Sequence, residues 1–252
     1  MNQVDATRKR PPGIVKRWGW RILAILQAAL LILVGLAAVA VASRYGGRWL
    51  PFLLAGAAGW VLAQVLKAGL SLPLAANPTT AAAMLSSVWF PVFAAVLPAL
   101  AEELGKYVPL RWMRVQAREQ ALALGLGAGA IEAVFLALPL LLNPVAGTTT
   151  LVGMLISVWE RSWAVTLHAG MATLDGFAAC ARRGRWLLAA MAAHFLADLP
   201  AGQYQRLVAL RAPGVVTWLV IAEILVPLLA LAALALGRGL WRKAGAAPGP
   251  AQ

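Results

Sequence analysis

Long apolar stretches alternate with short polar links along most of the chain. Seven of them have about the 20 residues that a helix needs to cross a bilayer: 22–43, 49–73, 83–110, 120–142, 151–178, 186–205 and 214–236. The pattern predicts an all-α, polytopic integral membrane bundle of about seven transmembrane helices. We expect one transmembrane domain over 22–236, a basic N-terminal tail over 1–21 and a basic, flexible C-terminal tail over 237–252.

Composition supports this interpretation and excludes a water-soluble domain. The chain is 62% hydrophobic and only 12% charged, with a mean hydropathy of +0.77, whereas soluble domains carry about 25% charged residues. The net charge of +13 is strongly basic. Because most basic residues lie in short links between apolar stretches, they are typical of membrane loops rather than of a nucleic-acid surface. We therefore expect contact with lipid and none with nucleic acid.

The basic links also predict an orientation. Clusters at Arg44 to Arg48, Arg111 to Arg118 and Arg182 to Arg185 alternate with the uncharged links 74–82 and 143–150. The positive-inside rule places the basic links and the C-terminus in the cytoplasm and the N-terminus outside. The basic N-terminal tail conflicts with this, because the same rule would keep it inside.

The few acidic residues are unusually placed. Seven of the nine fall inside or at the ends of apolar stretches, as do both histidines, His168 and His194. An ionisable group at the centre of a bilayer costs about 2.5–3.5 kcal/mol. So many of them indicate groups that pair, line a wet cavity or bind something. The acids are Glu102, Glu103, Glu132, Glu160, Asp175, Asp198 and Glu223.

Four of these groups are predicted to lie at a similar depth. Measured from the nearest basic cluster at ~1.5 Å per helical residue, Glu103 lies ~12 Å deep and His194 ~14 Å deep. Glu132 and His168 both lie ~21 Å deep on the same scale. Since the four residues belong to four different helices, their convergence within ~10 Å argues for a single site.

Local spacings predict how each group is held. Glu102 and Lys106 are i,i+4 neighbours, so we expect Lys106 to pair with Glu102 and leave Glu103 free as a ligand or base; an ordinary ion pair at a helix end is the alternative. Gly125 and Gly129 form a GxxxG face that admits a neighbouring backbone, and Glu132 lies on that face.

Two further spacings concern the histidines. Arg161 and His168 are seven residues apart on one stripe, with Arg161 as a candidate counter-ion. At i,i+4 from His194, Asp198 can orient the imidazole or act as a direct oxygen ligand; a satisfied packing pair is the alternative. Two imidazoles and one or two carboxylates form a plausible zinc set with an open position for water, which favours metal-assisted hydrolysis.

These motifs resemble those of the YhfC-type membrane peptidases, relatives of the PrsW and CAAX-endopeptidase (CPBP) superfamily of intramembrane metalloproteases. The resemblance covers most of residues 50–236. It rests on Glu102-Glu103-x-x-Lys106, on the glycine-rich run ending in Glu132, on Glu160-Arg161 with His168, and on His194-x-x-x-Asp198. One departure is Ala128, where YhfC-type sequences carry histidine and PrsW-type sequences phenylalanine.

The resemblance implies a role for each residue. Glu102 and Glu103, next to Lys106, would supply a metal ligand and the general base. Glu132, His168 and His194 would hold a divalent metal, most simply Zn²⁺, or position water. Asp198 would support His194, with Glu160 and Arg161 as further supporting residues. No other cofactor is expected, and the resemblance places the protein in a bacterial cytoplasmic membrane.

Three functions compete at this point. The first is a metal-dependent endopeptidase that cleaves a membrane protein or peptide in or near the bilayer. The second is a non-catalytic scaffold or chaperone subunit, a kind of protein that the same superfamily includes. The third, a small transporter or proton relay, is disfavoured because the sequence has no visible repeats and no pair of broken helices.

Overall fold

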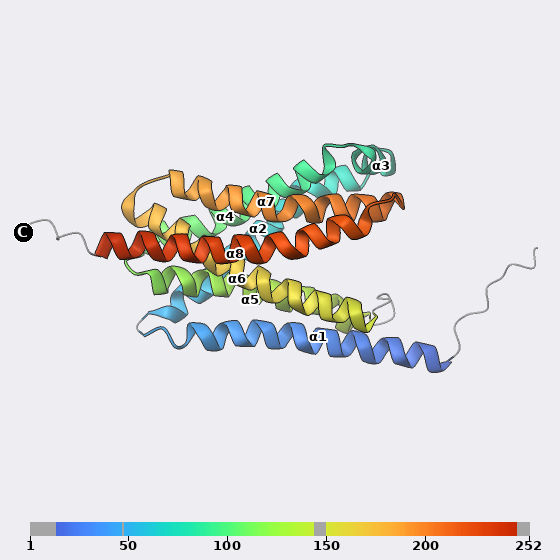
Figure 1. Ribbon diagram of the computed structural model, residues 1–252, viewed down its shortest axis with the longest axis horizontal. Helices are drawn as coiled ribbons and strands as arrows, with labels where there is room; N and C mark the ends of the chain where they lie inside the picture. Colours follow the sequence, from blue (N-terminus) through green and yellow to red (C-terminus); the bar gives the residue numbers. More distant parts are fainter. Residues whose placement is uncertain (1–13, 47, 144–149, 246–252) are drawn as a thin grey trace, which may run out of the picture.

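The computed structural model describes residues 14–46, 48–143 and 150–245, and within them it contains eight α-helices and no strand (Figure 1). The predicted fold class, a polytopic helical membrane protein, is confirmed. The helices are α1 (Ile14–Ala42), α2 (Trp49–Ala75), α3 (Pro78–Ser86), α4 (Phe90–Trp112), α5 (Arg118–Leu142), α6 (Leu151–Ala181), α7 (Arg185–Leu210) and α8 (Val215–Gly245).

Fewer helices of the described chain than the predicted seven have the length and hydropathy of a membrane span. By length and hydropathy, four helices of the described chain can cross a membrane: α1 from Arg21, α2, α5 and α8 up to Ala244. A fifth span is counted if α3 and α4 form one bent span. The helices α6 and α7 have 31 and 26 residues, and their apolar sequence is interrupted by charged groups of the site described below.

The predicted continuous stretch 83–110 is wrong, because the chain bends by 100° between α3 and α4. Ser87 adopts an extended conformation that ends α3. Pro91, in the first turn of α4, can begin a helix but cannot donate a hydrogen bond inside one. Asn77 caps the start of α3 by accepting hydrogen bonds from the backbone of Thr79 and Thr80. Hydropathy does not register any of these signals.

The outermost helices extend past the limits predicted for the transmembrane domain. Residues 14–21 belong to α1 and residues 237–245 to α8. The rest of both predicted tails, 1–13 and 246–252, lies outside the described residues, as does most of the uncharged link, 144–149.

The basic links lie together at one end of the bundle. The α1–α2, α4–α5 and α6–α7 connections and the C-terminal end of α8 gather on the left of Figure 1, whereas α3 and the α7–α8 connection lie at the opposite end. This arrangement agrees with the alternation of basic and uncharged links along the sequence.

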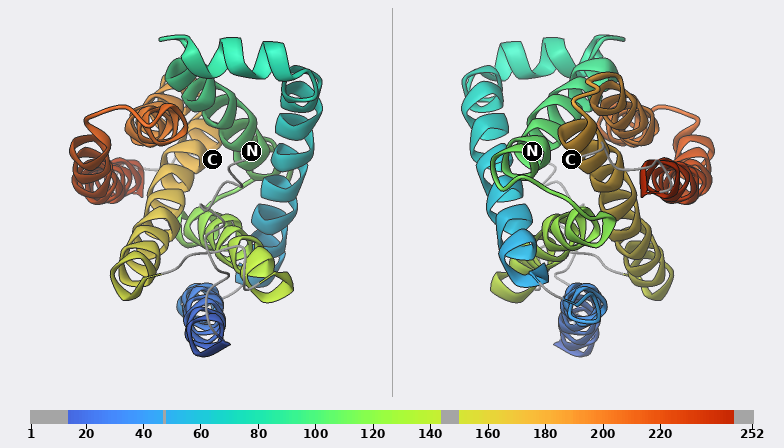
Figure 2. Two further views of the ribbon diagram at one scale, coloured as in Figure 1. Left: turned by 90° about the vertical axis from the view of Figure 1, so that its right-hand side faces the viewer. Right: turned by 90° about the vertical axis from the view of Figure 1, so that its left-hand side faces the viewer.

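The centre of the bundle is formed by α5 and α6, whereas α1 and α8 lie at its periphery (Figure 2). Small residues allow close helix contact there. A Cβ atom on Gly125 would lie 2.4 Å from the carbonyl oxygen of His168, and one on Gly129 would lie 2.7 Å from Cα of Val165. The predicted glycine face on α5 is therefore confirmed, with α6 as the neighbouring helix.

Candidate functional site

A cavity of about 250 Å³ lies inside the bundle and is lined by residues of α2, α4, α5, α6, α7 and α8. Most of the ionisable residues of the spans meet in it. Those in its wall are Lys67, Glu102, Glu132, Glu160, Arg161, His168, His194, Asp198 and Glu223. Three of the four groups predicted to converge, Glu132, His168 and His194, line this cavity. The fourth, Glu103, contacts His194.

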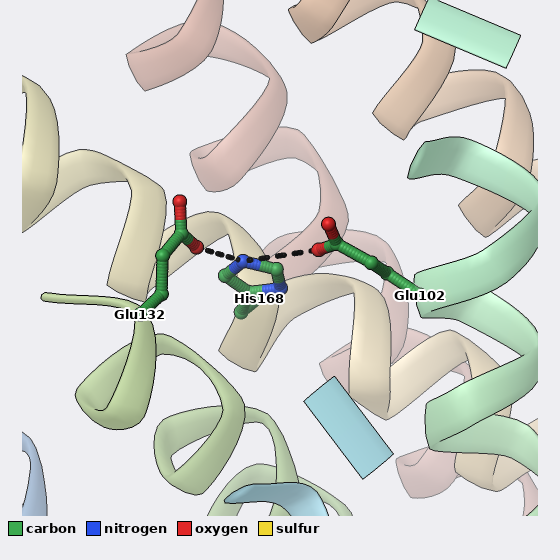
Figure 3. A group of neighbouring side chains, drawn as sticks. All are labelled: Glu102, Glu132 and His168. Atoms are coloured by element: carbon green, nitrogen blue, oxygen red, sulfur yellow. Dashed lines mark hydrogen bonds and ion pairs between the residues drawn. The ribbon is translucent and has the colours of Figure 1, made fainter. Parts of the chain in front are cut away.

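Three of these residues, from three helices, form the centre of the site. Glu102 on α4, Glu132 on α5 and His168 on α6 each offer one ligand atom, and these atoms lie within 4.8 Å of one another. His168 Nε2 lies 2.7 Å from Glu132 Oε2 and 3.8 Å from Glu102 Oε2, with the imidazole between the two carboxylates (Figure 3). The glycine face of α5 brings Glu132 and His168 together, because it allows α5 to approach α6 closely.

The other oxygen of each carboxylate is held by cationic or amide groups. Glu102 Oε1 accepts hydrogen bonds from Lys67 Nζ and, at 3.2 Å, from Gln64 Nε2. Glu132 Oε1 accepts a hydrogen bond from Arg161, which also pairs with Glu160. Both carboxylates are therefore anchored through Oε1, and their Oε2 atoms lie on either side of His168.

Glu103 lies behind this centre and is completely buried. Its Oε1 atom accepts hydrogen bonds from Lys106 Nζ at 2.7 Å and from His194 Nδ1 at 2.5 Å. The predicted Glu102–Lys106 pair is therefore wrong: Lys106 pairs at i,i+3 with Glu103, and Glu102 pairs with Lys67 from α2. Adjacent residues on a helix point about 100° apart, so Glu102 and Glu103 reach different partners.

The second histidine borders the same cavity. His194 Nε2 lies 3.9 Å from Glu102 Oε2 and 3.3 Å from Asp198 Oδ2, the predicted i,i+4 neighbour. The rings of His168 and His194 meet edge to face with their centroids 5.9 Å apart. Lys106 Nζ also lies 3.4 Å from His168 Nδ1, so Lys106 connects the two halves of the cluster.

The sequence analysis did not assign several residues of this site. Gln64 and Lys67 belong to α2, whose sequence is otherwise that of an apolar span. Their i,i+3 spacing places both on one face of the helix, and this polar face is the signal that could have predicted them. Glu223 on α8 also lines the cavity. The carboxylates Glu102, Glu103 and Glu132 each pair with one cationic side chain, which is Lys67, Lys106 and Arg161 respectively.

Together, the fold and the cluster define a polytopic helical membrane protein with a buried Glu/His site. Residues 28–149 match the model of a protein family described as "YhfC intramembrane metalloprotease". This segment contains Glu102, Glu103, Lys106 and Glu132, whereas both histidines lie beyond it.

The chain is also similar to a curated protein of Bacillus subtilis (strain 168), described as "Uncharacterized membrane protein YhfC". The two are 26% identical over 220 residues, which cover 74% of this chain and 83% of the relative. These two matches support a YhfC-type family assignment. No solved structure matches the chain.

Proposed function

We propose that this protein is an intramembrane metal-dependent endopeptidase that hydrolyses a peptide bond in or near the bilayer. The observation that carries the proposal is the group formed by Glu102, Glu132 and His168, whose ligand atoms converge inside a cavity of about 250 Å³. The family description, an intramembrane metalloprotease, supports the same reaction class.

The donor atoms suit a divalent metal. Zinc accepts carboxylate oxygen and imidazole nitrogen as ligands, and three protein ligands leave an open coordination position. Lys67 and Arg161 bind Oε1 of the two carboxylates, so both Oε2 atoms can act as ligands while their orientation stays fixed. A bound metal supplies Lewis-acid activation of the substrate carbonyl and makes water more acidic. We propose Zn²⁺ as the metal.

His194 is suited to accept the proton of the attacking water. We assign to His194 the tautomer in which Nδ1–H donates to Glu103 Oε1, so that Nε2, beside Glu102 and Asp198, is the atom that takes up the proton. A carboxylate that fixes the tautomer of a histidine in this way also raises its basicity. Glu103 then acts as a positioning residue, anchored by Lys106, and Asp198 stabilises the protonated imidazole. This assignment gives His194 the role of a base in place of the ligand role suggested by the sequence.

The substrate is a membrane protein or peptide that unwinds locally. Peptide groups of an intact transmembrane helix are hydrogen-bonded to one another, so a scissile bond must leave the helix to reach the Glu/His cluster. We propose the bacterial cytoplasmic membrane as the location.

A non-catalytic scaffold is the second candidate, and one observation favours it. Glu102, Glu103 and Glu132 each have a cationic partner within the chain, so the cluster can be satisfied without a metal. Such internal pairing would stabilise the packing of four helices, α2, α4, α5 and α6, around a polar centre.

Metal analysis of the purified protein separates the two candidates. We expect one equivalent of zinc in the wild type and its loss in His168→Ala and in Glu132→Gln. Glu119→Gln is the matched control, because Glu119 is exposed and lies outside the cavity. A folded wild-type protein that takes up no divalent metal would overturn the peptidase proposal and support the scaffold.

A further inference from the structure

A second cavity, of about 430 Å³, lies next to the polar one. It is open on one side and is lined by residues of α2, α3 and α4, and two residues, Lys67 and Pro98, belong to the walls of both cavities. Most of its wall is apolar and includes Met84 on α3 with Phe90 and Phe93 on α4. An apolar chamber therefore borders the side of the site where Glu102 and Lys67 pair.

The short helix α3 closes this chamber on one side. It runs across the end of the bundle (Figure 2) and contributes Ala81, Met84 and Leu85 to the wall. Arg206 on α7 holds its C-terminal end by donating to the carbonyl oxygens of Leu85 at 3.2 Å and Ser86 at 2.8 Å. The chamber is therefore formed by the 100° bend between α3 and α4, and it is not a gap between parallel helices.

The chamber also contains groups suited to a peptide backbone. Pro98 has no N–H, so it cannot donate the usual helical hydrogen bond to the carbonyl of Ala94, and both residues lie in the wall. Gln64, Lys67 and Ser71 follow one another on one face of α2, leading from the polar cavity into the apolar one. A polar edge beside an apolar wall fits an extended peptide with a large apolar side chain.

We propose that this chamber is a specificity subsite, which binds a large apolar side chain of the substrate polypeptide close to the scissile bond. The inference rests on the proposed peptidase function and names the class of residue that the enzyme selects. An acyl chain of a lipid fits the apolar wall equally well but has no N–H group for the carbonyl of Ala94. The unwound peptide supplies such a donor at nearly every residue.

Two matched variants test the subsite. Ala81→Phe places a large ring in the wall of the chamber, whereas Ala82→Phe makes the same change at the next residue of α3, which is exposed and does not line it. The probes are synthetic transmembrane peptides in proteoliposomes that carry Leu, Phe, Ala or Asp at one position at a time around a central helix-breaking segment.

We expect the wild type to favour Leu or Phe over Ala at one position by at least about tenfold in kcat/KM. Ala81→Phe should abolish that preference, and Ala82→Phe should retain it. Cleavage without any such preference, or a preference that Ala81→Phe leaves unchanged, would overturn the subsite while the peptidase function stands.

If no peptide is cleaved, that result counts against the proposed peptidase function. A binding measurement then tests the subsite separately. A peptide carrying photo-leucine at each position in turn is irradiated with the Glu102→Gln variant, and the crosslinked residues are mapped. Crosslinks to Met84 or Phe93 that Ala81→Phe removes would support the subsite. Crosslinks elsewhere, or a diazirine-labelled phospholipid that occupies the chamber and is not displaced by peptide, would overturn it.

Discussion

Glu103 on α4 and His194 on α7 are joined by a hydrogen bond of 2.5 Å between Oε1 and Nδ1. Glu103 is 0% exposed and His194 only 5%. Because the same oxygen atom also binds Lys106 Nζ, one buried carboxylate fixes both an imidazole and an ammonium group. We therefore interpret Glu103 as a positioning residue, whereas Glu102 is the carboxylate of this pair that lines the cavity.

Loss of Glu103 should therefore destabilise the fold strongly. Glu103→Gln leaves Lys106, which is 1% exposed, without its anionic partner. Removing one member of a buried ion pair costs about 3–5 kcal/mol. We expect a large decrease in thermal stability in detergent, together with loss of activity. The double variant Glu103→Gln/Lys106→Met should recover part of the stability, since it leaves no uncompensated charge.

The exposed Glu119→Gln variant is the control and should change the free energy of unfolding by less than about 0.5 kcal/mol. If Glu103→Gln unfolds at the wild-type temperature yet abolishes cleavage, Glu103 takes part in the chemistry, and our assignment of a positioning role is wrong.

Much of the fold and of the site could be predicted from the sequence, because charge is so rare in this chain. The depths of Glu103, Glu132, His168 and His194 predicted one cluster, since a buried charge without a partner is too costly in a membrane. The Gly125–Gly129 face likewise predicted close contact between helices. Both predictions depend on local spacing along a single helix.

Partner choice between helices could not be predicted in the same way. Lys106 can reach either Glu102 or Glu103 within its own helix, and the outcome depends on Lys67, which α2 brings to Glu102. The bend at Ser87 was missed for a related reason, because both sides of it are apolar. Hydropathy reports burial in lipid and not the direction of the backbone.

The approach of α5 to α6 should be essential for the site. Gly125→Ala would place a Cβ atom 2.4 Å from the carbonyl oxygen of His168, so α6 must shift. Overpacking of this kind costs about 1–3 kcal/mol, and the shift would separate His168 from Glu132. We expect lower thermal stability and weaker zinc binding, measured by calorimetry.

Gly69→Ala on α2 is the matched control for this prediction. A Cβ atom there meets no other atom within 4 Å, so helix propensity alone should stabilise the variant by about 0.5–1 kcal/mol. Equal metal affinity in Gly125→Ala and the wild type would show that the close approach does not set the geometry of the site.

Replacement of Asp175, a buried acid on α6, should increase the free energy of unfolding. Asp175 is 0% exposed, and neither of its oxygen atoms has a hydrogen-bond partner among the described residues. It lies beside Glu103, whose Oε2 atom also has no partner among the described residues, so the two carboxyl groups can form a hydrogen bond only when one of them carries a proton. Asp175→Asn supplies an N–H donor beside Glu103 without the cost of burying a carboxylate or protonating it, so we expect a gain of about 1 kcal/mol in the free energy of unfolding. A clear loss of stability would contradict this interpretation.

Arg206 should control the order of α3. Its two hydrogen bonds to the carbonyl oxygens of Leu85 and Ser86 hold the end of that helix to α7. Arg206→Gln should therefore accelerate amide hydrogen exchange in residues 78–86 by about tenfold, equivalent to about 1.4 kcal/mol. Arg211→Gln is the control, because Arg211 is an exposed arginine at the end of the same helix. Equal exchange in the two variants would exclude this role for Arg206.

The Lys67→Met variant distinguishes most directly between a protein with a metal site and a scaffold whose charges are paired internally. Lys67→Met removes the cation from Glu102 Oε1 and leaves a carboxylate that is about 6% exposed beside His168. Without metal we expect the variant to be less stable than the wild type. A ligand that binds only the native state stabilises it more, the higher its affinity, and loss of Lys67, which fixes the orientation of Glu102, should weaken zinc binding. Added zinc should therefore raise the unfolding temperature of Lys67→Met less than that of the wild type, whereas a scaffold without a metal site would show no zinc effect in either protein.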